Sequence, residues 1–463
     1  MPMIDPLIFR AYDIRGKAYA QLDEAACRLI GQGFGTIVRR MYTKDHPSVV
    51  VGRDARTHSP LFEQAVADGL LSTGCDVIRI GQTPSPVNYF TICDQKMDAG
   101  IQITASHNPK DDNGIKLQVR DADAFSGEDL QRLRTVIEQE DFMTGQGSER
   151  EYNAVTPYGN HLHAMFADAG KEKKIVVDAG NGVAGPVNCH VLQQTGADII
   201  GLYIEPDGEF PNHQPDPSKH STLKDLQAKV QEVKADIGFA FDGDGDRLGI
   251  VDEQGHIRSA DEILLLLAED HLSRHPGAPV VFTVSNSETL NTEIMRWGGK
   301  PVMCKVGHSY VEHAMREHKA TLGGEQSGHF FCGEDYYGFD DALVAALRIL
   351  SILQVQKGKT ISKLMEDFPR VYQTQELRPY CPDTEKAKIM ASVIRYFQKD
   401  YRVNTLDGAR IDFGDGAWAG IRQSNTSPCL SVCMEARSPE KLQEMETLVL
   451  DHLHTYGELT LES

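Results

Sequence analysis

Long apolar runs and paired cysteines are missing from this sequence. The longest apolar runs, 263–268 and 342–353, are short or interrupted by Arg348, so neither is long enough to span a bilayer. Residues 1–16 contain no basic segment followed by an apolar stretch, so we expect no secretory signal. Nine irregularly spaced cysteines, with no C-x-x-C, fit neither a disulfide framework nor a zinc site. These absences predict a cytoplasmic protein with no membrane partner.

An excess of basic residues is also missing. The chain has 47 Lys and Arg against 67 Asp and Glu, which gives a formal net charge of −20. This balance argues against a nucleic-acid or anionic-membrane surface. An anionic substrate would then have to be held by a few placed cations and backbone amides. No nucleic-acid partner and no obligate protein partner is expected. A globular chain of 463 residues should form two to four domains.

Helical and strand-like spacings alternate along most of the chain. Three βα cycles of similar length predict α/β domains with mixed, largely parallel sheets. Within the helix expected at 222–233, Asp225 is placed to close a capping box. The expected helices are 24–37, 61–72, 222–233, 261–271 and 289–297, and the expected strands are 48–51, 76–80, 99–103, 174–178, 197–204, 236–241, 248–251, 279–284, 301–305 and 320–322.

The last ninety or so residues have a different pattern. A helix expected at 384–398 precedes strands at 408–413 and 430–436, and Ser438-Pro439 should start a final helix. This order predicts a smaller α+β domain. The predicted domains are 1–153, 154–255, 256–368 and 369–463.

The strongest chemical signal is the sequence FDGDGDR at 241–247, directly after an apolar strand. Glycine lets the backbone curl, so the alternating Asp242, Asp244 and Asp246 side chains can converge on a hard divalent cation. A solvated acidic turn is the plainer alternative. A calcium loop is the closer rival, but Arg247 stands where an EF-hand needs glycine and a strand follows. Magnesium shared with a phosphate oxygen fits better.

The second signal is TASHNP at 104–109, after the apolar run 99–103. Asn-Pro favours a turn, which would leave Ser106 on a tight, exposed loop. Exposed turn serines are common, and alone this one is more often structural. Downstream, DNGIK at 112–116 predicts a second turn that carries Lys116. A lysine near a serine can take a proton or neutralise a phosphoryl group.

Two further loops carry polar groups between turn-forming residues. GEQSGH at 324–329 holds an acid, a hydroxyl and an imidazole, which could grip sugar hydroxyls or form a plain glycine-rich turn. RQSNTSP at 422–428 offers a guanidinium with hydroxyl and amide donors, as a phosphate site would. No Walker A sequence and no G-x-G-x-x-G opening a helix is present, so nucleotide hydrolysis and dinucleotide redox chemistry lose their usual support.

Together these motifs resemble the α-D-phosphohexomutase superfamily, and most closely its phosphomannomutase/phosphoglucomutase branch. The resemblance covers the whole chain. It rests on FRAYDIRG at 9–16, GRD at 52–54, TASHNP, DNGIK, FDGDGDR, GHS at 307–309, GEQSGH and RQSNTSP. It implies three related α/β domains and a smaller C-terminal α+β domain around a central active-site cleft.

The resemblance also implies roles for individual residues. Ser106 would be the phosphorylated serine, and its phosphate would complete the Mg²⁺ shell formed by Asp242, Asp244 and Asp246. Lys116 and Arg247 would be the basic residues beside it, with His308 and His329 also catalytic. The implied substrate-binding residues are Tyr12, Arg15, His107, Ser285, Glu325, Gln326, Ser327, Gly328, His329, Arg422, Ser424, Asn425 and Thr426.

The implied reaction moves a phosphoryl group between the 1- and 6-positions of a mannose or glucose phosphate. It would pass through a bisphosphorylated sugar, with a glucose 1,6-bisphosphate-type activator as cofactor. Two departures leave the sugar open: Ser285 stands where the branch usually has lysine, and Gln326 resembles phosphoglucosamine mutases. A phosphoglucosamine mutase is therefore an alternative. A metal-dependent phosphatase or esterase with a serine nucleophile, and a non-catalytic sugar-phosphate binding module, are more distant ones.

Overall fold

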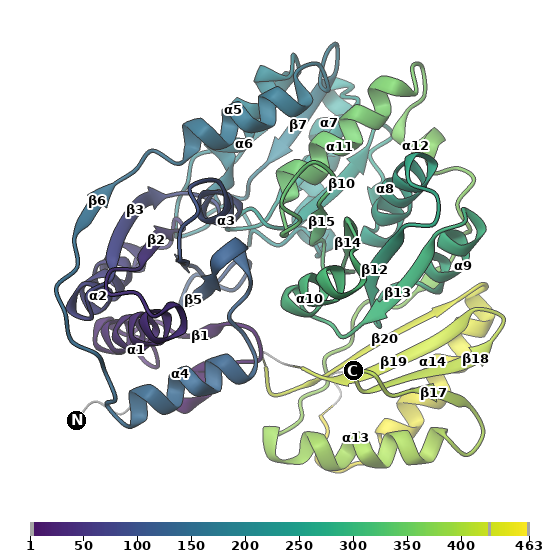
Figure 1. Ribbon diagram of the computed structural model, residues 1–463. Coiled ribbons are helices and arrows are strands. Elements are labelled where there is room, and N and C mark those ends of the chain that lie inside the picture. Colours follow the sequence, from purple (N-terminus) through teal and green to yellow (C-terminus); the bar gives the residue numbers. More distant parts are fainter. Residues whose placement is uncertain (1–3, 425–426, 461–463) are drawn as a thin grey trace. The chain divides into compact units, whose positions relative to one another are not determined.

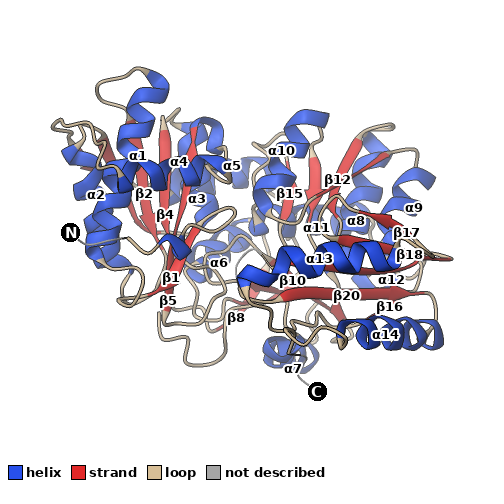
Figure 2. Ribbon diagram, turned by 90° about the horizontal axis from the view of Figure 1, so that it is seen from below, coloured by secondary structure: helices blue, strands red, loops and turns tan. Residues whose placement is uncertain are grey.

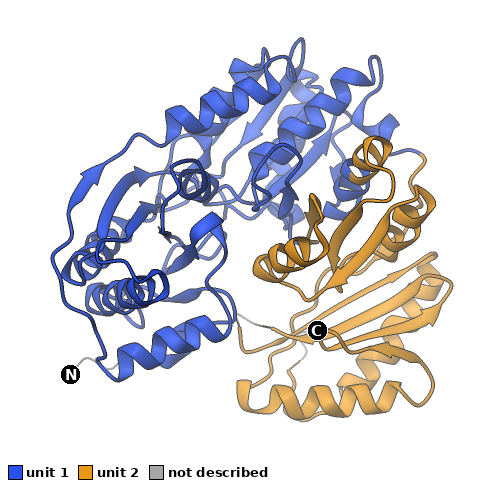
Figure 3. Cartoon of the chain, in the orientation of Figure 1, with its two compact units in different colours: residues 1–267, 327–366 blue, residues 268–326, 367–463 orange. Residues whose placement is uncertain are grey.

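The structure is a computed structural model, and it describes residues 4–424 and 427–460. Helices and strands alternate along most of the chain (Figures 1 and 2). The chain divides into two compact units (Figure 3): unit 1 contains residues 1–267 and 327–366, and unit 2 contains 268–326 and 367–463. This division is coarser than the four domains expected from the sequence, so the boundaries at 153, 255 and 368 stay predictions.

The first sheet of unit 1 has the strand order β1-β5-β4-β2-β3-β6. The central strands β4, β2 and β3 are parallel, and β5 runs antiparallel to both β4 and β1. The turn predicted at 112–116 is therefore wrong, because these residues begin β5. The strands are β1 (Ile14–Lys17), β2 (Ser48–Arg53), β3 (Asp76–Gln82), β4 (Ala99–Ile103), β5 (Asp112–Val119) and β6 (Glu149–Glu151).

Helices accompany this sheet along the chain, and two of them pack with their backbones in close approach. Asp23 caps α1 by accepting a hydrogen bond from Ala26 N at 2.8 Å. A Cβ on Gly31 of α1 would lie 2.3 Å from Val66 O of α2, so glycine is needed where they cross. The elements are η1 (Pro6–Ile8), α1 (Glu24–Tyr42), α2 (Ser59–Ser72), α3 (Ser85–Asp94), η2 (Arg120–Ala122) and α4 (Glu128–Glu138).

The second sheet of unit 1 has the order β11-β10-β9-β7-β8. Strand β7 is parallel to β8 and β9, whereas β9 and β10 form an antiparallel hairpin. The turn of this hairpin is the acidic loop, residues 242–247. The elements are α5 (Val155–Phe166), β7 (Lys174–Asp178), α6 (Ala184–Gln194), β8 (Asp198–Leu202), η3 (His220–Leu223), α7 (Lys224–Val233), β9 (Ile237–Phe241), β10 (Leu248–Asp252) and β11 (Ile257–Arg258).

The capping box predicted at Asp225 is wrong. The short helix η3 occupies the first predicted turn, so α7 begins later and its capping position is Leu223, which makes no side-chain cap. Asp225 instead accepts a hydrogen bond from the Tyr203 hydroxyl at 2.7 Å. It ties the loop after β8 to the start of the helix.

Unit 1 also contains β15 (Phe330–Cys332), α11 (Ala342–Val355) and α12 (Ile361–Leu364). Asp341 caps α11 by accepting hydrogen bonds from Leu343 N and Val344 N, both at 3.1 Å. The hydroxyls of Tyr158 and Tyr336 also donate to this carboxylate. Burial raises the pKa of Asp341 to about 6, although these hydrogen bonds act in the opposite direction.

Asp341→Asn should change how stability depends on pH. The folded protein holds this proton up to about pH 6, whereas the unfolded chain releases it near the ordinary value of 3.8. Asp341 therefore lowers the free energy of unfolding as pH rises through this window, by up to about 3 kcal/mol. Asparagine keeps the cap without the charge. The free energy of unfolding of both proteins is measured in urea at pH 4.5 and 7.5. The variant should gain stability relative to the wild type at the higher pH, and a difference between the two proteins that is the same at both pH values would contradict the prediction.

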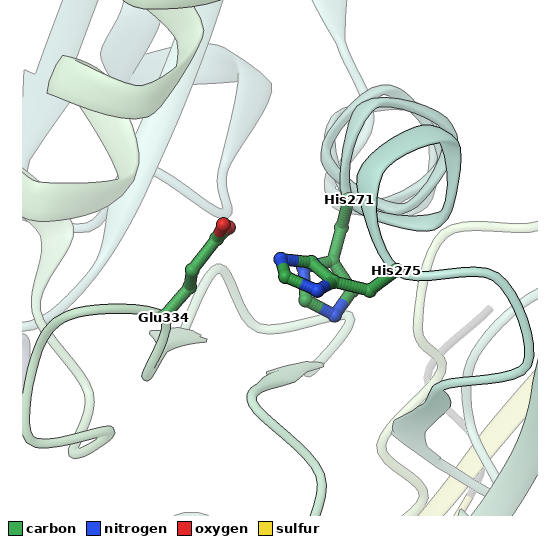
Figure 4. Close-up of side chains that lie close together, drawn as sticks. All are labelled: His271, His275 and Glu334. Carbon is green, nitrogen blue, oxygen red and sulfur yellow. The ribbon is translucent and has the colours of Figure 1, made fainter.

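Unit 2 contains a parallel arrangement in which β12 pairs with β13 and β14. The elements are α9 (Glu288–Arg296), α10 (His308–His318), β12 (Pro279–Thr283), β13 (Lys300–Cys304) and β14 (Leu322–Gly324). The division between the units falls within α8 (Ala260–Arg274). At the end of α8, the rings of His271 and His275 lie 4.8 Å apart (Figure 4), and Thr321 Oγ1 is 3.3 Å from His271 Nε2.

The C-terminal part of unit 2 has a sheet of order β16-β20-β19-β18-β17, in which every neighbouring pair is antiparallel. Ser438 caps the last helix by accepting from Lys441 N at 3.2 Å, as predicted. The elements are β16 (Tyr372–Gln373), α13 (Asp383–Phe397), β17 (Arg402–Asn404), β18 (Ala409–Gly414), β19 (Ala417–Gln423), β20 (Leu430–Ala436) and α14 (Pro439–Leu453).

The predicted fold class is confirmed: mixed α/β sheets are followed by a smaller α+β part. Within residues 4–424 and 427–460, no helix is both long enough and apolar enough to cross a bilayer.

Candidate active site

The serine loop, residues 104–112, follows the buried strand β4. Ser106 has a left-handed backbone with φ of 52°, which is uncommon for a residue with a side chain. Its N–H donates to Thr104 Oγ1 at 2.9 Å, and Asn108 N donates to Ala105 O at 3.0 Å. The loop is tight, as predicted, but the predicted exposure is wrong, because Ser106 is only 1% exposed.

The acidic loop lies directly against the serine loop and explains its burial. A Cβ on Gly243 would come within 2.4 Å of Ser106 O, so glycine allows the two backbones to meet. The Ser106 hydroxyl donates to Asp242 Oδ2 at 2.5 Å. Two loops that are far apart in the sequence therefore bring a hydroxyl and a carboxylate together.

The three aspartates of the acidic loop converge. One oxygen from each of Asp242, Asp244 and Asp246 lies within 4.8 Å of the others, and all three side chains are fully buried. Asp242 Oδ1 accepts hydrogen bonds from the N–H groups of Gly245, Asp246 and Arg247 at 3.0–3.2 Å. Burial and the neighbouring carboxylates raise the pKa of Asp242 well above its ordinary value. A bound cation would remove this cost.

Lys116 and Ser85 hold one side of this acidic group. The Lys116 ammonium donates to Asp244 Oδ2 at 2.7 Å and also to Asp246 Oδ2. The Ser85 hydroxyl donates to Asp244 Oδ2 at 2.5 Å. Burial alone would lower the pKa of Lys116, but Asp244 and Asp246 outweigh it and raise that pKa well above its usual value. Lys116 is therefore a fixed positive charge in this arrangement.

The remaining carboxylate oxygens fit a metal ion. Among the residues that the structure describes, Asp244 Oδ1 and Asp246 Oδ1 are buried without a hydrogen-bond partner. Asp242 Oδ2 contacts only the Ser106 hydroxyl and, at 4.0 Å, the Arg247 guanidinium in the described contacts. Asp244 and Asp246 thus each have one oxygen without a hydrogen bond, and Asp242 Oδ2 holds the Ser106 hydroxyl beside them. Such a set of hard oxygen donors could hold a divalent cation.

Arg247 and His329 complete the cluster. Arg247 Nε donates to His329 Nε2 at 3.3 Å. This histidine nitrogen also lies 3.4 Å from Asp246 Oδ1 and 3.7 Å from Asp340 Oδ2. Ser327 Oγ lies 3.0 Å from His329 Nδ1. At Gly328, φ of 94° and a bond from Leu248 N to its carbonyl place this loop against β10.

Three of the predicted substrate residues lie in or before the first sheet. Arg15 donates to Asn108 Oδ1 at 2.9 Å and pairs with Asp13 at 2.6 Å. His107 Nδ1 lies 3.1 Å from Ser106 Oγ, and burial, Arg247 and Arg15 lower the pKa of His107 well below its ordinary value. Tyr12 is half-buried in the loop before β1. Ser106, Lys116, Arg247, His329 and the three aspartates therefore form one cluster, and Arg15 and His107 touch its serine loop.

The other predicted substrate residues belong to unit 2. His308 is the first residue of α10, directly after Gly307, whose N–H donates to Glu325 Oε2 at 2.8 Å. Glu325 and Ser285 are buried, and Gln326 is half-buried. That these residues share one substrate site with Ser106 stays a prediction.

The predicted phosphate loop begins within the last two residues of β19 in unit 2. Arg422 Nη2 lies 3.7 Å from Glu376 Oε1, and Ser424 Oγ accepts a hydrogen bond from Arg378 Nη2 at 3.2 Å. Asn425 and Thr426 lie outside the described residues. The buried Lys386 donates to the carbonyls of Ser424 and Ser427, which the sequence did not indicate.

Sequence reasoning missed several residues around the serine. Ser85, Asp340 and Arg56 all touch the cluster or its loops. Arg56 lies beside the GRD motif, which was the only available hint. No local pattern indicates which carbonyls its guanidinium would reach.

Family models of known proteins match four consecutive parts of the chain. Four models of the phosphoglucomutase/phosphomannomutase family match: alpha/beta/alpha domain I at residues 6–144, domain II at 156–255, domain III at 259–372 and the C-terminal domain at 365–452.

Similar proteins share nearly the whole length. A phosphomannomutase/phosphoglucomutase of Pseudomonas aeruginosa is 39% identical, covering 98% of this chain and 96% of that protein. A phosphoglucomutase of Neisseria meningitidis is 35% identical, covering 95% of each. A crystal structure of a phosphoglucomutase/phosphomannomutase family protein from Burkholderia thailandensis matches with a TM-score of 0.88 at 38% identity, covering 96% of both chains. The chain therefore belongs to the phosphoglucomutase/phosphomannomutase family of phosphohexomutases, isomerases that transfer a phosphoryl group on a hexose phosphate.

Proposed function

We propose that Ser106 carries the phosphoryl group and that the substrate is a mannose or glucose phosphate, converted between its 1- and 6-phosphates. The contact between Ser106 Oγ and Asp242 Oδ2, at 2.5 Å, supports this most strongly. It brings a nucleophilic hydroxyl to the oxygens that suit a metal ion. We assign Asp242, Asp244 and Asp246 as Mg²⁺ ligands, with the Ser106 phosphate as a further ligand.

Mg²⁺ would neutralise charge on the phosphoryl group during transfer. The chain supplies two further positive charges at the same place, Lys116 and Arg247. In the forward half-reaction, the bond between Ser106 Oγ and phosphorus breaks while a sugar hydroxyl oxygen bonds to phosphorus. We assign His329 as the base that receives the hydroxyl proton, because its imidazole lies beside the acidic loop, with Nε2 3.4 Å from Asp246 Oδ1.

The product of this step is a bisphosphorylated sugar. Its other phosphate returns to Ser106 after the sugar reverses its orientation. The substrate must then be held in two orientations, for which we propose Tyr12, Arg15, His107, Ser285, His308, Glu325, Gln326, Ser327 and Gly328, with Arg422, Ser424, Asn425 and Thr426 at the distal phosphate. Loops from several domains would grip the sugar and keep water away.

A panel of 1-phosphates tests the reaction and the sugar together. Glucose, mannose and glucosamine 1-phosphates are each incubated with the enzyme, Mg²⁺ and a sugar bisphosphate, and the 6-phosphates are quantified. We expect fast conversion of the glucose or mannose compound, and intact mass should show one phosphoryl group on the purified protein. A preference for glucosamine 1-phosphate would reassign the sugar. Phosphate release that exceeds isomerised product would instead indicate a phosphatase.

A further inference from the structure

The serine loop is wound around one buried guanidinium. Arg56, which is 0% exposed, donates from Nη2 to the carbonyls of Ser106 and Asn108, both at 2.8 Å. From Nη1 it donates to the carbonyls of Pro109 at 2.6 Å and Asp112 at 2.8 Å. Its Nε pairs with Asp54 Oδ2 at 3.0 Å. All five N–H donors of the guanidinium therefore have an acceptor, and four of these acceptors are carbonyls of this one loop.

This arrangement has a direct effect on the nucleophile. A left-handed serine persists only where its surroundings hold it, since this conformation is unfavourable for a residue with a side chain. Arg56 fixes the Ser106 carbonyl, and with it the direction in which the hydroxyl leaves the backbone. The partner of Arg56 is fixed in turn: Asp54 accepts from the Ser59 hydroxyl at 2.7 Å and from Arg56 N at 3.0 Å.

A loop that follows a strand of the second sheet covers the guanidinium. This cover segment, residues 203–216, follows β8 in the same unit. The ring of Phe210 lies over Arg56, 5.3 Å from centroid to guanidinium carbon, and Phe210 has a left-handed φ of 47°. A Cβ on Gly208 would lie 2.4 Å from Ala55 O, so the cover segment packs tightly against the backbone beside Arg56.

The cover segment also holds the serine loop directly. Gln214 Nε2 donates to His107 O at 2.5 Å, and Lys110 pairs with Glu209 at 2.6 Å. The serine loop is thus held from within by Arg56 and from outside by the cover segment. Neither contact involves the metal-binding carboxylates.

We propose that Arg56 is the positioning residue of Ser106, which holds the hydroxyl at the distance from Asp242 that phosphoryl transfer needs. This inference rests on the proposed role of Ser106. Arg56 does not reach the reacting atoms, so its loss should slow the chemical step without weakening the binding of substrate or metal. A displacement of about 1 Å can slow a reaction on the order of 100-fold.

The experiment compares Arg56→Lys and Arg56→Ala with a matched control, Arg39→Lys. Arg39 is a mostly buried arginine of the same unit that also donates to two carbonyls, those of Thr73 and Thr144, but does not touch the serine loop. We expect kcat of Arg56→Lys to fall on the order of 100-fold, with KM and Mg²⁺ affinity within about twofold, because an ammonium cannot replace the planar fork. Added guanidinium ion should partly restore Arg56→Ala and have no such effect on the control.

The proposal is wrong if folded Arg56→Lys and Arg56→Ala keep a kcat similar to that of the control, or if KM and kcat change in equal proportion. If the Arg56 variants do not fold, Phe210→Ala serves instead. Hydrogen exchange of the 104–112 amides should then accelerate and kcat should fall. The proposal is overturned if either the exchange rate or kcat stays the same. If the wild-type protein has no mutase turnover, the proposed function is refuted. Hydrogen exchange of the serine-loop amides would still show whether Arg56 holds the serine loop.

Discussion

Ser106→Ala should abolish mutase turnover, with a loss on the order of 10⁴-fold or more, because the proposed mechanism gives the phosphoryl group no other carrier between the two sugar positions. The intact mass of the variant should show no added phosphoryl group. Mg²⁺ affinity should fall much less than turnover in a comparison with unphosphorylated wild-type protein, since Asp242, Asp244 and Asp246 remain. Turnover is measured by the appearance of hexose 6-phosphate from the 1-phosphate.

The matched control for this experiment is Ser126→Ala, a serine in the loop before α4. It should retain full activity and the phosphoryl group on the protein. Residual turnover above a few per cent in purified Ser106→Ala, or a phosphoryl group still present in the intact mass of the variant, would show that another residue carries the phosphate.

Asp244→Asn should remove most of the metal affinity and most of the activity. Its Oδ1 is one of two buried carboxylate oxygens of the acidic loop that have no hydrogen-bond partner among the described residues. The substitution also places an amide beside the Lys116 ammonium, which now donates to Asp244 Oδ2 at 2.7 Å. We expect Mg²⁺ affinity to fall 10- to 100-fold or more and kcat on the order of 100- to 1,000-fold. Calorimetric titration with Mg²⁺ and steady-state rates at saturating metal provide the two measurements.

Asp252→Asn is the matched control, because Asp252 is a fully buried aspartate at the end of β10 that pairs with Arg258 outside the cluster. It should reduce stability but leave the Mg²⁺ affinity of the folded protein unchanged. Unimpaired metal binding and turnover in Asp244→Asn would exclude the proposed ligand role.

The acidic loop could be predicted because its chemistry and its geometry are both local. Asp242, Asp244 and Asp246 alternate with glycines after an apolar strand, and this pattern alone makes the carboxylates converge. The turn expected at 112–116 was wrong for a non-local reason. Asp, Asn and Gly favour turns locally, but here they pair with β1 on one side and β4 on the other, and this pairing prevails.

The arrangement around the serine could be predicted only in part. Its partner Asp242 stands 136 positions away, and Ser85 reaches Asp244 across 159 positions. Motifs indicated which loops carry chemistry, but only the folded chain shows which atoms meet. Arg56 illustrates the limit: four of its five acceptors are backbone carbonyls, and any residue type can offer a backbone carbonyl.

The cover segment has a consequence for how such chains can be recombined. Phe210 and Gln214 lie in the loop after β8 of the second sheet, yet they complete the surroundings of a loop from the first sheet. A chimera that takes residues 1–153 from one relative and the remainder from another would join halves whose contacts were not selected together. Exchanging 203–216 along with the first segment should keep these contacts intact. The residues that must be exchanged together therefore extend beyond the segment that contains Ser106.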